Sequence, residues 1–199
     1  MKDSTKLDKS TLLIPLFKLL NEIQPIDGDL EELLISSFKI DKVSKGIIVL
    51  KEGEVCRNLW FLADGLMRSF HKIGEKEVTS RIMFTNHIVI SAGSFFKQTD
   101  ATESIETLAD CTLLTLPFTG LQKVYAQHPL FNYHTRLITE DYFFKQEQRL
   151  YMLRKPNAED KYSYFLEHYS NYLQAIPLKH IASFLNIARE TLSRLRNRK

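Results

Sequence analysis

The last stretch of the chain, IPLKHIASFLNIARETLSRLRNRK (residues 176–199), decides the architecture, because it holds two short helical patterns on either side of one turn. Pro177 suits the first turn of a helix, where its missing N–H costs nothing. Ile181 and Leu185 lie four residues apart and therefore share one face of that helix. Asn186 then predicts a break, since asparagine is one of the few residues besides glycine that tolerates a left-handed backbone.

The second helical pattern has one apolar and one polar face. Leu192 and Leu195 lie three residues apart and predict its inward face. This is the layout of a helix-turn-helix, whose first helix braces the second in the major groove of DNA. Arginine offers a planar fork to guanine, glutamate accepts from cytosine, and serine is adaptable. The candidate base-contacting residues are Arg189, Glu190, Ser193 and Arg194.

The distribution of charge agrees with a DNA partner. The net charge is +3, but residues 176–199 hold six cations and one acid, which leaves −2 on the rest of the chain. A basic tail on a slightly acidic body favours a polyanion such as double-stranded DNA. An αα-hairpin with a solvated basic face is the alternative that pattern and charge leave open. The cations suited to phosphate contacts are Lys179, Arg196, Arg198 and Lys199.

The middle of the chain has a β pattern. Residues 37–117 contain short apolar or alternating runs separated by glycine turns and by no helical pattern, which predicts an antiparallel roll or barrel. Asp64-Gly65, between two apolar runs, predicts a hairpin. Residues 10–36 predict short helices and residues 118–199 predict longer ones. The expected fold class is therefore α+β, with an N-terminal β-roll and a C-terminal helical bundle.

A long helix is expected between the roll and the C-terminal bundle, and Pro156 marks its end. Two adjacent apolar rows run along it, so that it can pack on its own domain and on a partner at once. Burial on one side alone is the alternative, and the pattern does not choose between them. One row, spaced by seven, is Leu130, Leu137, Phe144 and Tyr151; the other is Phe131, Ile138 and Met152.

Several classes of protein are disfavoured. No apolar run approaches the roughly 18 residues of a membrane span, and the polar N-terminus lacks the apolar core of a secretory signal, so a cytoplasmic protein without a membrane partner is expected. Cys56 and Cys111 are expected to be reduced thiols. No His-x-His pair, Gly-x-Ser-x-Gly, P-loop or His-Glu-x-x-His occurs, so neither an enzyme nor a metal site is expected.

The motifs resemble those of the Crp/Fnr (cyclic-AMP receptor protein-like) transcription regulators. Residues 189–194 (RETLSR) match the Arg-Glu-Thr-x-x-Arg pattern of that family's recognition helix, and the β zone matches it at LKEGE (50–54) and LWFLADG (59–65). The resemblance implies a bacterial regulator of transcription that binds a two-fold DNA site as a homodimer, with RNA polymerase as a further partner. Its implied domains are a cyclic-nucleotide-binding-like β-roll, or double-stranded β-helix (1–128), a dimerisation helix (129–155) and a helix-turn-helix domain (156–199).

The phosphate-binding cassette departs from the family pattern. Nucleotide-binding members have a glycine and a glutamate before the cassette and an arginine after it, whereas this chain has Ile90, Ser91 and Ala101 at those positions. Only Thr102, where a hydroxyl is frequent, is retained. Because a buried phosphate needs a paired cation and donors, we expect no affinity for cyclic AMP or cyclic GMP. The effector, a small molecule if one exists, is not identified by the sequence, and no cofactor is expected.

Two further departures concern other branches of the family. The oxygen-sensing cysteine cluster is missing, and His71, His87, His128 and His134 lie in no recognisable haem pattern. The sequence stops at Lys199, directly after the recognition helix, as in a short subtype without the β-hairpin wing. The alternative function is accordingly a ligand-sensing or protein-interaction module that has lost DNA binding.

Overall fold

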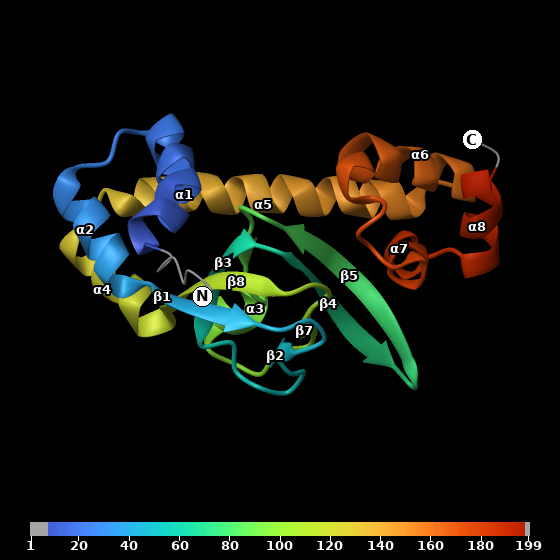
Figure 1. Cartoon of the computed structure of the whole chain (residues 1–199), viewed down its shortest axis with the longest axis horizontal. Coiled ribbons are helices and arrows are strands. Elements are labelled where there is room, and N and C mark those ends of the chain that lie inside the picture. Colours follow the sequence, from blue (N-terminus) through green and yellow to red (C-terminus); the bar gives the residue numbers. More distant parts are fainter. Residues whose placement is uncertain (1–7, 198–199) are drawn as a thin grey trace, which may run out of the picture.

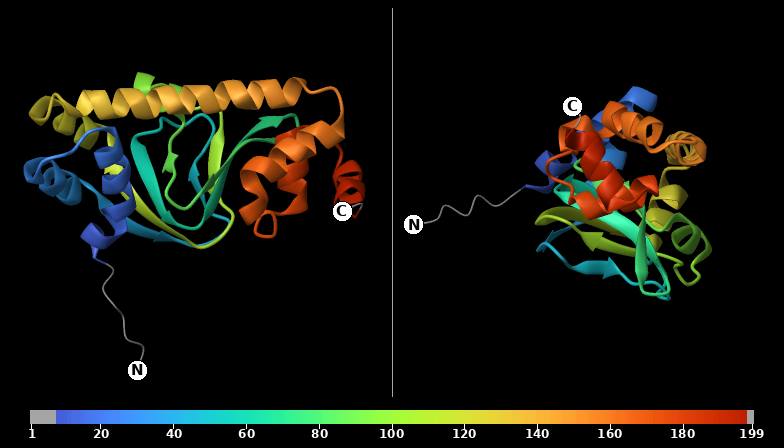
Figure 2. Two further views of the ribbon diagram at one scale, coloured as in Figure 1. Left: turned by 90° about the horizontal axis from the view of Figure 1, so that it is seen from above. Right: turned by 90° about the vertical axis from the view of Figure 1, so that its right-hand side faces the viewer.

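A computed structural model describes residues 8–197 and shows three parts arranged along one axis (Figure 1). Two N-terminal helices lie at one end, a β-roll lies in the middle and three short helices lie at the other end. The long helix α5 (Phe131–Arg154) runs beside all three parts, as the view from above also shows (Figure 2). The expected α+β class with a β-roll, a long helix and a C-terminal helical bundle is confirmed.

Aspartates begin both N-terminal helices. Asp8 precedes α1 (Lys9–Ile23) and accepts from the backbone N–H of Ser10, while Asp27 precedes α2 (Gly28–Ser37) and accepts from that of Leu30 at 2.8 Å. Such caps satisfy N–H groups that a first helical turn leaves without partners. The inner faces of both helices are leucine-rich and pack on the roll. The helix α4 (Phe118–Gln127) packs beside them.

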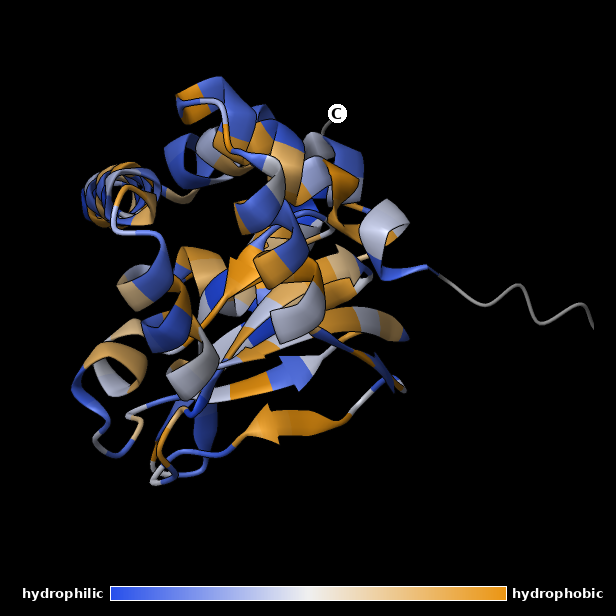
Figure 3. Ribbon diagram, turned by 90° about the vertical axis from the view of Figure 1, so that its left-hand side faces the viewer, coloured by the Kyte–Doolittle hydropathy of each residue, from blue (hydrophilic) through white to orange (hydrophobic). Residues whose placement is uncertain are grey.

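Two four-stranded antiparallel sheets form the roll, with strand orders β1-β8-β3-β6 and β2-β7-β4-β5. Figure 3 shows long hydrophobic stretches on these strands, as expected for strands that face a core. A short helix, α3 (Ala92–Lys97), interrupts the strands between β6 and β7. The strands are β1 (Lys39–Val43), β2 (Ile48–Leu50), β3 (Asn58–Asp64), β4 (Leu66–Ile73), β5 (Lys76–Phe84), β6 (Ile88–Val89), β7 (Ser104–Thr107) and β8 (Cys111–Pro117).

The prediction of a hairpin at Asp64-Gly65 is wrong, because β3 and β4 belong to different sheets. Gly65 instead forms a corner between the sheets with a φ of 123°, where a Cβ atom would lie 2.5 Å from the Sγ of Cys111. The hairpin of the roll lies one strand later, between β4 and β5, where Ile73 pairs with Lys76 across a two-residue turn. Gly74 is the first residue of that turn and has a φ of 61°.

The two apolar rows of α5 lie in different surroundings. Phe131 and Met152 are buried against the protein's own body, whereas Leu130, just before the helix, and Tyr151 leave 73% and 68% of their surface exposed. Phe144 is also exposed, and Leu137 is half-buried. The chain's own fold therefore buries one row of the helix and leaves most of the other open to solvent.

The C-terminal helices share a second hydrophobic core with the roll. They are α6 (Ala158–Tyr169), the 3-10 turn η1 (Ser170–Tyr172), α7 (Leu178–Leu185) and α8 (Arg189–Asn197). Leu66, Ile82 and Phe84 of the roll pack in this core with side chains of α6, α7 and α8. The ring of Phe84 stacks on that of Tyr172 with centroids 3.7 Å apart. The bundle is therefore docked on the roll.

Candidate nucleic-acid interface and ligand pocket

The turn between α7 and α8 has the geometry that Asn186 predicts. Asn186 is left-handed, with φ 51° and ψ 52°. Its N–H donates to the carbonyl of Ser183 at 3.1 Å, and the N–H of Ile187 donates to that of Ala182 at 3.0 Å. These two bonds define a Schellman motif, which closes a helix and turns the chain sharply. Pro177 is the residue before α7 rather than within its first turn.

The helix α8 lies at the far end of the molecule (Figures 1 and 2) and contacts α6 and α7. Leu192 is fully buried and Leu195 is half-buried, so they form its inward face, as expected. Of the candidate base-contacting residues, Arg189, Glu190 and Arg194 are exposed and Ser193 is half-buried. Arg196, a candidate phosphate contact, is exposed on the same helix. Arg198 and Lys199 lie outside the described residues.

The first helix of the pair, α7, faces the roll. Its Ser183 hydroxyl accepts from the backbone N–H of Thr79 at 2.9 Å and donates to the carbonyl of Glu77 at 3.2 Å. Lys179, a candidate phosphate contact, is exposed but lies close enough to Glu77 to help lower the pKa of that carboxyl, against the opposing effect of desolvation. In this arrangement Lys179 is therefore near an acid of the roll as well as open to solvent.

Arg149 of α5 joins the roll to α7. Its guanidinium donates to the carbonyl of Phe184 and to that of Thr79, both at 3.1 Å, and lies 3.9 Å from the centroid of the Phe184 ring. Burial lowers the pKa of Arg149 to about 10, so the side chain stays charged at neutral pH. One cation of α5 therefore contacts both the roll and α7.

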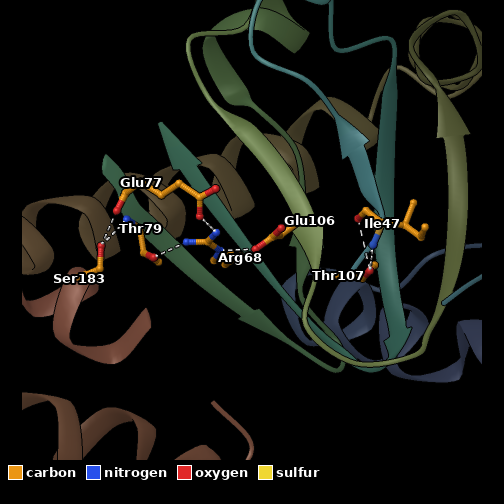
Figure 4. A network of polar contacts seen from close by, with 7 residues as sticks. All are labelled: Ile47, Arg68, Glu77, Thr79, Glu106, Thr107 and Ser183. Atoms are coloured by element: carbon orange, nitrogen blue, oxygen red, sulfur yellow. Dashed lines mark hydrogen bonds and ion pairs between the residues drawn. The ribbon is translucent and has the colours of Figure 1, made fainter. Parts of the chain in front are cut away.

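A second buried arginine, Arg68, lies inside the β4–β5 sheet and is only 2% exposed. It pairs with Glu77 and, at 2.5 Å, with Glu106, and it donates to the hydroxyl of Thr79 at 3.1 Å. Figure 4 shows this network and the approach of Ser183 to the same strand. Glu77 and Thr79, the residues of β5 that bond Ser183 of α7, are thus also held by Arg68 inside the roll.

The cassette positions surround the short helix α3. Ile90, Ser91 and Ala101 are buried, and Thr102 is exposed. Next to them, Arg81 donates to Glu103 at 2.8 Å, to the carbonyl of Ile90 at 2.6 Å and to the hydroxyl of Ser69 at 3.1 Å. The cation that contacts the cassette at Ile90 is therefore paired with a carboxylate of the protein itself.

Sequence reasoning missed Arg68, Arg81, Arg149 and Ser183. One signal was present, because Arg68 is a single cation in the otherwise uncharged strand segment LMRSF (66–70). A charge in a buried strand requires a partner. No comparable signal existed for Ser183, whose partner Thr79 is 104 residues away.

These features define a class: a roll of the cyclic nucleotide-binding type, joined by a long helix to a helix-turn-helix. Residues 40–128 match the family described as "Cyclic nucleotide-binding domain". The match covers less than half of the chain, and the described residues have the fold of solved Crp/Fnr regulators, as the sequence predicted. Among curated proteins no sequence match is found.

Solved structures with this fold include three regulators. FixK2 from Bradyrhizobium japonicum has a TM-score of 0.71 and 13% identity, over 81% of this chain and 83% of that one. CooA from Carboxydothermus hydrogenoformans, solved as a mutant, has a TM-score of 0.67 and 19% identity over 92% and 82%. A regulator from Eubacterium rectale, described as a member of the crp/fnr family, has a TM-score of 0.67 and 19% identity over 91% and 85%.

The described residues contain neither a cluster of metal ligands nor a membrane-spanning helix. Between residues 8 and 197 no group of three or more His, Cys, Asp or Glu side chains is placed to hold a metal ion. No helix in the same part of the chain is long and apolar enough to cross a membrane.

Proposed function

We propose that this protein is a transcription regulator that binds a two-fold DNA site as a homodimer. The observation that carries the proposal is the placement of α8. Its Arg189, Glu190 and Arg194 are exposed at the end of the molecule, while Leu192 fixes the helix against the bundle. An exposed, basic second helix after a tight turn is what insertion into the major groove requires.

The homodimer is supported by α5. Leu130, Phe144 and Tyr151 follow one another at intervals of fourteen and seven residues and are exposed, as are Phe143 and Leu150. A row of large apolar side chains along a helix is typical of a surface that a partner covers. Two copies related by a two-fold axis would bury this row and present two copies of α8, which read half-sites one DNA turn, or ~34 Å, apart.

We infer further that cyclic AMP and cyclic GMP are not effectors. A cyclic phosphate would have to displace Glu103 from Arg81, and the positions that hold the sugar and phosphate in the family are Ile90, Ser91 and Ala101 here. Replacing Glu103 by a phosphate on Arg81 gives the phosphate no additional cation and leaves the Glu103 carboxylate without its partner. Calorimetry with either nucleotide should give no binding heat, and micromolar affinity would refute this inference.

DNA binding is tested by fluorescence anisotropy with a pool of genomic fragments at two salt concentrations, without added ligand. We expect salt-sensitive binding that enriches a palindrome. Arg189→Ala and Arg194→Ala should each weaken binding to the enriched site by about 1–3 kcal/mol, whereas Arg57→Ala, which removes an exposed arginine of the roll, should not. If no site is enriched even with cell-extract metabolites, the protein is an interaction module instead.

A further inference from the structure

A cavity of about 370 Å³ runs beneath α5, between that helix, the roll and the C-terminal bundle. Its volume is in the range of small-molecule sites. Most of the lining is apolar, with contributions from Ile82, Ile88 and Leu121. The polar and charged lining comes mostly from α5, between Thr135 and Arg149, and Arg149 lies beside Phe184 of α7. The cavity therefore has a more polar wall along α5, which includes Arg149, and largely apolar walls elsewhere.

Some of the charged side chains that line this cavity have an ion-pair partner and one does not. Arg81 is paired with Glu103, and Asp141 is paired with Lys145 at 2.6 Å. Arg149 makes no ion pair with any carboxylate among residues 8–197, and its guanidinium bonds only two backbone carbonyls there. Buried charges are usually paired, because the interior solvates them poorly. The half-buried guanidinium of Arg149, which bonds carbonyls but no carboxylate, is therefore the cation of this cavity that can pair with an anion.

We propose that the cavity beneath α5 binds an apolar monocarboxylate, whose carboxylate pairs with Arg149 and whose apolar body lies along the rest of the cavity. A guanidinium binds a carboxylate through two parallel hydrogen bonds, which makes arginine well suited to this ligand class. The cavity reaches Ile90 of the cassette and Arg81, but Arg81 is already paired with Glu103, so that Arg149 is the cation left for the ligand. The ligand needs no phosphate and no sugar.

The same guanidinium gives the ligand a route to the DNA-binding helices, which rests on the proposed function. Arg149 donates to Phe184 of α7 and to Thr79 of the roll, and it also lines a second cavity, of about 520 Å³, beside Ser183 and Asn186. A carboxylate on Arg149 competes with the Phe184 carbonyl for its N–H groups. The ligand therefore favours a state in which α7 is less tightly held on the roll.

Calorimetry of the full chain with decanoate and with 4-phenylbutyrate tests the ligand class. We expect at least one acid to bind, and decan-1-ol to bind about tenfold more weakly than decanoate because it cannot pair with a cation. This comparison needs no variant. Binding of neither acid at about 1 mM, or equal binding of decanoate and decan-1-ol, would overturn the proposal.

Variants test the role of Arg149. Arg149→Met should weaken binding of the acid about tenfold or more, while Arg149→Lys, which keeps the charge without the fork, should have a smaller effect. Arg154→Met changes an exposed arginine of the same helix and should leave binding unchanged. Loss of binding in Lys145→Met with full binding in Arg149→Met would overturn the assignment. If Arg149→Met does not fold, the binding of the acid to Arg149→Lys and the comparison of decanoate with decan-1-ol still test the proposal.

Amide hydrogen exchange tests the coupling without DNA. Saturating acid should speed exchange in residues 178–185 of wild-type protein, and not in Arg149→Met. Unchanged exchange in the wild type would overturn the coupling. Because neither experiment contains DNA, failure of this proposal is distinguishable from failure of DNA binding, which the anisotropy experiment reports separately.

Discussion

The hydroxyl of Ser183 accepts a hydrogen bond from the backbone N–H of Thr79, at 2.9 Å, across 104 residues of sequence. Thr79 lies on β5, an edge strand whose outer N–H groups have no neighbouring strand. The same hydroxyl donates to the carbonyl of Glu77. A single side chain of α7 thus satisfies one N–H and one carbonyl of an exposed sheet edge, and such edges ordinarily require protection. The site where the bundle docks is set by this edge.

Ser183→Ala tests that relationship. It leaves the buried N–H of Thr79 without its partner, so we expect the free energy of unfolding to fall by about 1–3 kcal/mol. Urea denaturation followed by circular dichroism measures the change. Ser163→Ala, at an exposed position of α6, should change the free energy by less than about 0.5 kcal/mol. Equal effects of the two substitutions would contradict the importance of this contact.

Arg68→Ala should be among the most destabilising single substitutions in the roll. It removes a cation that is 2% exposed and leaves Glu106, which is 17% exposed, without a counter-charge. Breaking one side of a buried pair costs about 3–5 kcal/mol. Arg136→Ala breaks an exposed pair with Glu140 and should cost no more than about 1 kcal/mol. Thermal unfolding of the two variants compares these effects, and a smaller loss for Arg68→Ala than for Arg136→Ala would refute the expectation.

Local features were predictable from the sequence, and long-range ones were not. The turn at Asn186 depends on one residue's tolerance of positive φ, and it was predicted correctly. The hairpin at Asp64-Gly65 was predicted wrongly. The alternation of apolar and polar residues identifies a strand but not the sheet that the strand joins. The strand β1 lies within the predicted β zone but was not identified as a strand of its own, since only Ile40 and Val43 of KIDKV (39–43) are apolar and the strand is mostly exposed. The pairing of Ser183 with Thr79 arises only from the docking of two parts of the fold.

His180 predicts a specific pH dependence. It is buried in α7, and desolvation, with Arg68 and Lys179 nearby, lowers its pKa to about 4. Between pH 6.5 and about 4 the unfolded chain binds a proton at this histidine that the folded chain does not. The free energy of unfolding therefore falls as the pH is lowered through this window, by at most about 1.4 kcal/mol per pH unit from this group.

His180→Gln should remove that part of the slope. Urea denaturation at several pH values between 4 and 6.5 measures it, with His168→Gln, at an exposed position of α6, as the control. We expect the control to keep the slope of the wild type. If His180→Gln keeps it as well, the histidine is protonated in the folded protein and its side chain is solvated more fully than its burial indicates.

The exposed row of α5 predicts an assembly that a single substitution can disrupt. Phe144 and Tyr151 are 59% and 68% exposed and lie seven residues apart, so that two copies of the helix would bring them into one interface. Phe144→Glu and Tyr151→Glu place a carboxylate in that interface and should each convert a dimer to a monomer in analytical ultracentrifugation. Because both side chains already contact water in the single chain, the folded protomer should tolerate the change, and its circular dichroism should be retained. Glu32→Lys, at an exposed position of α2, controls for a change of surface charge. A wild-type chain that sediments as a monomer at all concentrations would contradict the dimer, and with it the two-fold DNA site, because one α8 contacts only one half-site.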